Sequence, residues 1–147
     1  MIMDRITKDL MFAMKNKQTD RLEALRAVKT AFILARTNAG NKDVTEDEEL
    51  KIIQKLVKQR KDSAAEFLAQ NRSDLAEKET AEAAIISEYL PKQLSVDEIK
   101  TVVTRIVAET AASSMKDMGK VMGVASKELA GKADGKIVSD IVKALLG

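Results

Sequence analysis

Apolar residues recur three and four positions apart along most of the chain, which is the spacing of the buried face of an α-helix. No stretch alternates apolar and polar residues over the length of a strand. Seven helices are expected, well above the helix content of an ordinary domain, so the pattern predicts an all-α protein. They run from about Met3 to Lys15, Asp20 to Asn38, Thr45 to Gln70, Asp74 to Leu90, from Ser95 onward, from Met115 to Ala130, and from Asp134 onward.

Capping residues support these boundaries. Thr45–Glu48 and Ser95–Glu98 have the capping-box sequence, in which a hydroxyl accepts from a backbone N–H and the glutamate returns a bond to the helix start. Asp20, Asp74 and Asp134 are expected to cap the second, fourth and seventh helices.

The only proline, Pro91, lies between the fourth and fifth helices. Proline cannot continue a helix and disfavours helical geometry in the preceding residue. We therefore expect an N-terminal bundle of about four helices over residues 1–91 and a small C-terminal three-helix domain over residues 92–147.

Composition restricts the chemistry of the 147-residue chain, which has no His, Cys or Trp. Histidine-based triads, thiolate nucleophiles, disulfides and ordinary zinc sites are excluded. Ser113 and Lys116 have a spacing used by some acyl-transfer enzymes, but the motifs that accompany it there are missing. The acids of residues 43–49 suit a helix start, and no calcium-loop pattern occurs. We therefore predict no catalytic residue, no metal and no cofactor.

No apolar run approaches the roughly 18 residues that cross a bilayer, so no membrane partner is expected. The first residues lack a continuous apolar segment, and Asp4 and Asp9 argue against a transit peptide. These features lead us to expect a cytoplasmic protein.

The net charge of +2 conceals alternating acidic and basic blocks, of which residues 51–62 and 116–147 are basic. Such blocks suit a nucleic-acid backbone, and they equally suit solvated helix faces that pack beside opposite charges. The candidate RNA-binding residues are Lys120, Lys132 and Lys136, with Lys58, Arg60 and Lys61 as a second patch. The three phenylalanines, Phe12, Phe32 and Phe67, fall on expected buried faces, so contact with phosphates is favoured over base stacking.

Two glycine pairs are candidate backbone features. Gly119 and Gly123 lie one turn apart in the sixth helix, where each costs up to about 1 kcal/mol relative to alanine. Either close helix packing or a groove for another molecule's backbone would offset that cost. Gly131 and Gly135 flank a turn into the seventh helix, which is either a plain turn or an anion site.

Several segments resemble a known family. Residues 56–63, 74–79 and 88–95 are similar to the stand-alone YqeY proteins. Residues 118–122 and 131–134 resemble the tail domain of GatB, a component of the tRNA-dependent Asn/Gln amidotransferase. The resemblance implies a larger N-terminal helical bundle, a small C-terminal three-helix domain and contact with the body of a tRNA, with Lys132 as the natural phosphate contact.

The resemblance leads us to expect a non-catalytic tRNA-binding or translation-associated accessory. A helical module that docks a protein through Met118, Met122 and the Gly119–Gly123 region is the alternative. A second alternative is an accessory to carbon–nitrogen ligase chemistry with glutamine as the amide donor. The chain has neither the kinase-like portion of GatB nor the Ser-rich signature of the amidase component, so an independent ligase is not expected.

Overall fold

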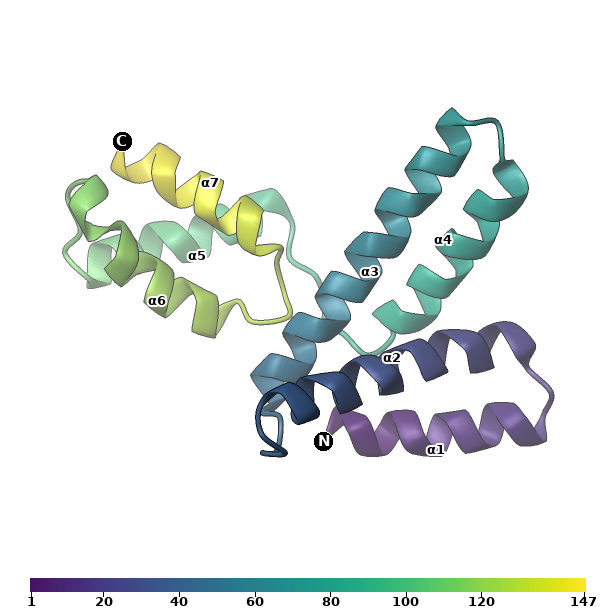
Figure 1. The fold of residues 1–147 in the computed structure, drawn as a ribbon. Coiled ribbons are helices and arrows are strands. Elements are labelled where there is room, and N and C mark those ends of the chain that lie inside the picture. Colours follow the sequence, from purple (N-terminus) through teal and green to yellow (C-terminus); the bar gives the residue numbers. More distant parts are fainter. The chain divides into compact units, whose positions relative to one another are not determined.

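The computed structural model describes residues 1–147 and contains only helices (Figure 1). The elements are α1 (Ile2–Lys15), α2 (Thr19–Asn38), α3 (Glu46–Ala69), α4 (Ser73–Ser87), α5 (Val96–Glu109), a short 3-10 helix η1 (Met115–Asp117), α6 (Met118–Glu128) and α7 (Gly135–Leu146). The predicted all-α class is confirmed. The chain divides into two compact units, an N-terminal unit of Met1–Leu90 and a C-terminal unit of Pro91–Gly147.

Two antiparallel helix pairs, α1 with α2 and α3 with α4, make up the N-terminal unit (Figure 1). Each of the four helices contributes at least one fully buried aliphatic side chain to a single core. These side chains include Ile6, Leu25, Ile53 and Ile86. The N-terminal unit is therefore held by one shared apolar core.

The C-terminal unit has its own core, to which α5, α6 and α7 all contribute. Val103 and Ile106 come from α5, Val121 and Ala125 from α6, and Val142 from α7; all five are fully buried. These residues recur at three- and four-residue spacing, so each helix offers one apolar face to the other two.

Three predicted caps are present. The Glu48 N–H donates to Thr45 Oγ1 at 3.2 Å, and the Thr45 N–H donates to Glu48 Oε2 at 3.1 Å. The Glu98 N–H donates to the Ser95 hydroxyl oxygen at 3.2 Å, but the predicted return bond from Glu98 to the backbone is not formed, because the Ser95 hydroxyl itself donates to Glu98 Oε1 at 3.2 Å. The Lys136 N–H donates to Asp134 Oδ1 at 3.0 Å, so that residue caps α7.

Two predicted caps are wrong. Helices α2 and α4 begin one residue before Asp20 and Asp74, with Gln18 and Arg72 at the N-cap positions and no side-chain cap bond. Both aspartates lie in the first turn, where a carboxylate still complements the helix dipole. Helix α4 also ends at Ser87, before the predicted end at Leu90.

Two residues assigned to buried faces are exposed. Phe12 is 61% exposed, because α1 turns Ala13 toward α2 and leaves the neighbouring position outside. The spacing of apolar residues in the seventh helix also places Leu145 on the inward face, but it is 40% exposed, because Val142 and Leu146 occupy the core-facing positions of α7. In both helices the buried face is narrower than the apolar pattern suggested.

Candidate nucleic-acid interface

The basic patch predicted on α3 is partly used inside the N-terminal unit. Arg60 Nε lies 3.5 Å from Glu82 Oε2, and both side chains are less than one-fifth exposed. Burial raises the pKa of Glu82 more than the neighbouring Arg60 lowers it. Arg60 therefore joins α3 to α4, while Lys58 and Lys61 lie on the exposed surface of α3.

In the C-terminal unit, Lys120 bridges two helices. Its Nζ donates to the Thr110 carbonyl oxygen at 2.9 Å, at the C-terminal end of α5. A lysine ammonium in this position satisfies a carbonyl that the helix itself leaves unbonded. The contact holds the exposed Lys120 side chain across the surface between α5 and α6.

Lys132 lies in the loop before α7, whose backbone is held in place, and Lys136 lies in the first turn of α7. The Leu94 N–H donates to the Lys132 carbonyl oxygen at 2.9 Å, and Gln93 Nε2 donates to the Gly131 carbonyl oxygen at 2.7 Å. Gly131 has φ +73°, a left-handed geometry that glycine adopts without strain. Both lysine side chains are exposed, so the loop and the start of α7 present one ammonium group each.

The start of α7 does not have the geometry of an anion site. The Asp134 carboxylate already accepts from the Lys136 N–H, which places a negative charge where a phosphate would bind. Gly135 is exposed, and a Cβ added there would have no atom within 4 Å. This turn is therefore a capped helix start beside two exposed lysines.

Gly119 and Gly123 do not pack closely against another helix. A Cβ built on either glycine would have no atom within 4 Å, so close packing within the chain is not their role. Both line a shallow groove on α6. The other residues of the groove are Lys120, Val124, Lys127 and Glu128.

The single acid of this groove is paired. Glu128 accepts a hydrogen bond from Arg105, which also donates to Glu109 at 3.0 Å. These acceptors raise the pKa of Arg105, with Glu109 as the larger cause. Arg105 is shared by two carboxylates, which leaves one negative charge, so Lys120 and Lys127 make the formal charge of the groove and this ion pair +1.

Sequence reasoning missed a polar cluster in the N-terminal unit. The buried Tyr89 hydroxyl donates to Asp9, and the Arg5 guanidinium lies 5.0 Å from the Tyr89 ring centroid. Arg21 donates to Glu88 at 2.5 Å, and this contact is the main cause of its raised pKa. Asp9 and Tyr89 are eighty residues apart, so no local motif signals the contact.

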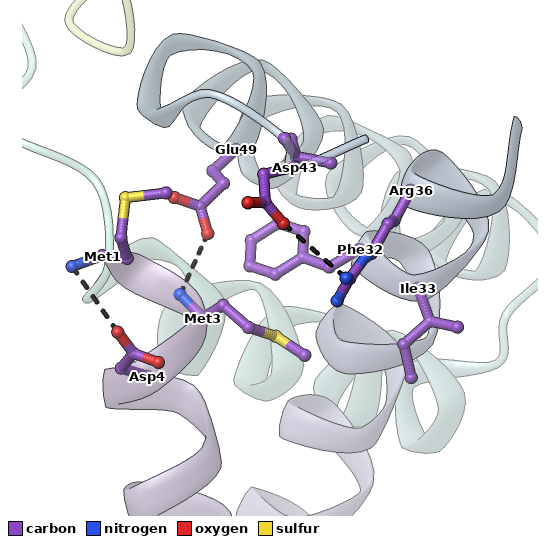
Figure 2. Close-up of a pocket in the computed structure, with 9 residues that line it drawn as sticks. Met1, Met3, Asp4, Phe32, Ile33, Arg36, Asp43 and Glu49 are labelled. Atoms are coloured by element: carbon purple, nitrogen blue, oxygen red, sulfur yellow. Dashed lines mark hydrogen bonds and ion pairs between the residues drawn. The ribbon is translucent and has the colours of Figure 1, made fainter. Parts of the chain in front are cut away.

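A second missed residue is Glu49, which the sequence presents as one more acid of a helix start. It is 2% exposed, and its Oε2 accepts from the Met3 N–H at 3.0 Å. The carboxylate of α3 therefore caps the first turn of α1 and lines a pocket beside it (Figure 2).

The fold defines the class: a small all-α protein of two compact units, with exposed glycines and lysines on the second. Comparison with family models identifies the class: residues 3–146 match the model described as Yqey-like protein. The chain belongs to the YqeY family.

Curated relatives carry the name "Altered inheritance of mitochondria protein 41, mitochondrial". The protein from Lachancea thermotolerans is 36% identical over 111 residues, covering 74% of this chain and 59% of the relative. The protein from Pyrenophora tritici-repentis is 30% identical over 149 residues, covering 99% of this chain and 81% of the relative. The protein from Candida glabrata is 30% identical, and the match covers 90% of this chain and 71% of the relative.

These names contradict the expectation of a cytoplasmic protein, because the relatives are named as mitochondrial. The cytoplasmic prediction rested on the amino-acid composition and the first few residues, and neither of these determines the compartment of a protein. Membrane spanning is a separate matter, and none of the helices has the length and apolar character to cross a bilayer.

Proposed function

We propose that this YqeY-family protein is a non-catalytic accessory that binds the phosphate backbone of a folded tRNA through its C-terminal unit. The observation that carries the proposal is the exposed backbone of α6 at Gly119 and Gly123, which we call the glycine strip. Gly119 and Gly123 leave helix backbone uncovered, and Lys120 and Lys127 line the same groove.

The cost of the two glycines supports an external contact. Gly123 lies in the interior of α6, where glycine costs up to about 1 kcal/mol relative to alanine, and Gly119 lies in the first turn of the same helix. Nothing inside the chain approaches either position closely enough to offset that cost. A ligand backbone lying against the strip would benefit from the missing side chains, and flanking ammonium groups would bind its phosphates.

The residue types on this surface favour phosphates over bases. The C-terminal unit contains no aromatic residue, so it has no platform for base stacking. Its exposed lysines include Lys120, Lys127, Lys132 and Lys136. Such a surface recognises the shape and charge of a folded RNA, and sequence contributes little.

The test is titration of folded tRNA at increasing salt. Replacing Lys132 and Lys136 together by Glu is expected to weaken binding more than tenfold and to flatten its salt dependence, because two phosphate contacts are lost. The matched control replaces Lys8 and Lys15, two exposed lysines of α1, by Glu. Absence of binding at low salt, or an equal loss in the control, would overturn the proposal.

A helical protein partner is the second candidate for the same groove. Val124 lies within it and is 40% exposed, which would suit an apolar contact from another helix. A photoreactive amino acid at position 124 separates the two candidates. RNA adducts in cells support tRNA binding, and adducts with one defined protein favour the docking module.

An accessory role beside glutamine-dependent carbon–nitrogen ligase chemistry would follow if the tRNA that binds is an amidotransferase substrate. The chain by itself is expected to release no ammonia from glutamine. Measured turnover by the purified protein would require an enzymatic function instead.

A further inference from the structure

Glu49 leaves one carboxylate oxygen without a partner inside the protein. Oε2 accepts from the Met3 N–H at 3.0 Å, whereas Oε1 is buried and makes no hydrogen bond. The residue is 2% exposed and is the one buried charged side chain of the structure. Such an oxygen is costly to bury unless something donates to it.

The carboxylate lies at a pocket of about 350 Å³ within the N-terminal unit. Figure 2 shows the Glu49 carboxylate between Met1 and Met3, with the Phe32 ring nearby. The remaining apolar lining comes from Ile33 and Val44. Met1 is 62% exposed and Ile33 is 50% exposed, so two side chains at the mouth are free to move without disturbing the core.

The other charges around the pocket are already paired, and these pairs are drawn in Figure 2. Arg36 lies 3.7 Å from Asp43, and the amino group of Met1 lies 4.0 Å from Asp4. Glu49 has no cation among its partners. The uncompensated charge of the pocket is therefore negative; it is shared by the two carboxylate oxygens of Glu49, of which Oε1 has no donor.

This arrangement suits an organic cation better than a metal ion. Asp4, Asp43 and Glu49 do not form a cluster that could coordinate a metal. A primary ammonium has N–H donors for one oxygen, and its alkyl stem would be covered by the Met1, Phe32 and Ile33 side chains. The aromatic ring adds a surface that attracts cations.

We propose that this pocket binds the ammonium group of a primary alkylamine, with an ammonium N–H donating to Glu49 Oε1. The amine is supplied either by a small free amine or by a lysine side chain of another protein. The site lies on the N-terminal unit and is independent of the proposed tRNA contact. Binding requires the Met1 side chain to rotate away from the carboxylate.

The test is an NMR titration of the full chain with n-butylammonium, with Nα-acetyl-lysine methylamide and with tetramethylammonium as separate probes. We expect saturable shifts of the Met3 and Glu49 amide signals with n-butylammonium, and none with tetramethylammonium, which has no N–H. Saturable shifts with the lysine derivative too would assign the site to lysine side chains. A response to n-butylammonium alone would assign it to free amines.

Glu49→Gln is the decisive variant, because its amide oxygen still accepts from the Met3 N–H while its NH₂ group replaces Oε1. We expect affinity for n-butylammonium to fall more than tenfold. Glu46→Gln removes the same charge from an exposed position of the same helix and should bind like the parent.

A variant at the mouth keeps the test valid if Glu49→Gln does not fold. Ile33→Ser shortens a half-exposed wall of the pocket and should weaken n-butylammonium severalfold. No saturable shift in the parent protein, equal shifts with tetramethylammonium, or unchanged affinity in both variants would overturn the proposal.

Discussion

The two units use their charged residues differently. In the N-terminal unit, several side-chain contacts join one helix to another: Arg60 of α3 to Glu82 of α4, Lys78 of α4 to Glu23 of α2, and Tyr89, just after α4, to Asp9 of α1. In the C-terminal unit, the ion pair between helices is that of Arg105 with Glu128, and most lysines extend into solvent.

This difference separates structural charge from charge that is available to a partner. Arg60 is committed to α4 and is desolvated, so recruiting it for a phosphate would disrupt an internal pair. Lys132 is exposed on a loop whose backbone is held by other contacts, and Lys136 is exposed in the first turn of α7. Basic residues of similar appearance in the sequence therefore have different roles.

The largest expected effect distinguishes the two cores. Ile53→Ala and Ile106→Ala each remove a fully buried side chain, at a cost of about 2–5 kcal/mol in unfolding free energy. The smaller C-terminal unit has less stability to lose. The only tyrosine lies in the N-terminal unit and there is no tryptophan, so tyrosine fluorescence follows that unit alone.

With Ile106→Ala we expect far-UV circular dichroism to show early loss of helix while the tyrosine transition stays in place. Ile53→Ala should move the tyrosine transition itself. If Ile106→Ala shifts both signals together, the units unfold as one, and the comparison between them fails.

The next effect concerns the buried hydrogen bond of Tyr89. Asp9→Ala leaves its hydroxyl without that acceptor, so we expect a loss of about 1–3 kcal/mol from the N-terminal unit, measured by urea unfolding. Lys8→Ala, at an exposed position next to it, is the control and should change stability little. An equal effect of both variants would show that the bond contributes nothing.

The same cluster gives a pH dependence. Burial, followed by the bond to Asp9, raises the pKa of Tyr89 above the ordinary value of about 10. Because the folded state favours the protonated phenol, its contribution to stability is complete below about pH 10 and is lost as the pH rises further. Absorbance at 295 nm should show tyrosinate at higher pH in the folded protein than in urea, and Asp9→Asn should reduce that difference.

A smaller effect on stability distinguishes a residue that caps a helix in the structure from one that was only predicted to do so. Asp134→Ala removes the side chain that caps α7 and should cost about 1 kcal/mol. Asp20→Ala should cost only a few tenths of a kcal/mol, because Asp20 lies in the first turn and caps nothing. Thermal unfolding of the two variants gives the comparison, and a larger loss for Asp20→Ala would contradict it.

The smallest effect has the opposite sign. Gly119→Ala and Gly123→Ala should each stabilise the C-terminal unit by up to about 1 kcal/mol, since alanine is the better helix former and a new Cβ meets no atom within 4 Å. Affinity for tRNA should fall in the same variants. Greater stability with unchanged affinity would remove the glycine strip from the proposed interface.

Local features of the fold were predictable from the sequence. The helices, three of the caps and most of the buried positions follow from residues within one or two turns of each other. The predicted caps at Asp20 and Asp74 were wrong because adjacent residues compete to start a helix. When the helix begins one residue earlier, the aspartate lies in the first turn and is no longer the cap. Phe12 was wrongly predicted to be buried, because an apolar residue next to a buried helix face need not lie on that face.

The candidate sites depended on distant residues. Glu49 meets Met3 across forty-six positions, and no pattern in the acidic segment distinguishes it from its exposed neighbours. Arg60 similarly has the sequence context of a surface arginine until α4 brings Glu82 beside it. The glycines of α6 could be recognised as costly, but only the structure shows that nothing packs on them.

By itself, the sequence determined that this chain is helical, where its helices lie and which chemistries it lacks, because these properties depend on composition and on neighbours within a few turns. Tertiary structure decided which charges are paired, which carboxylate is buried and which helix backbone is left open. Those outcomes depend on contacts between residues far apart in the chain, whose energies exist only once the helices have packed.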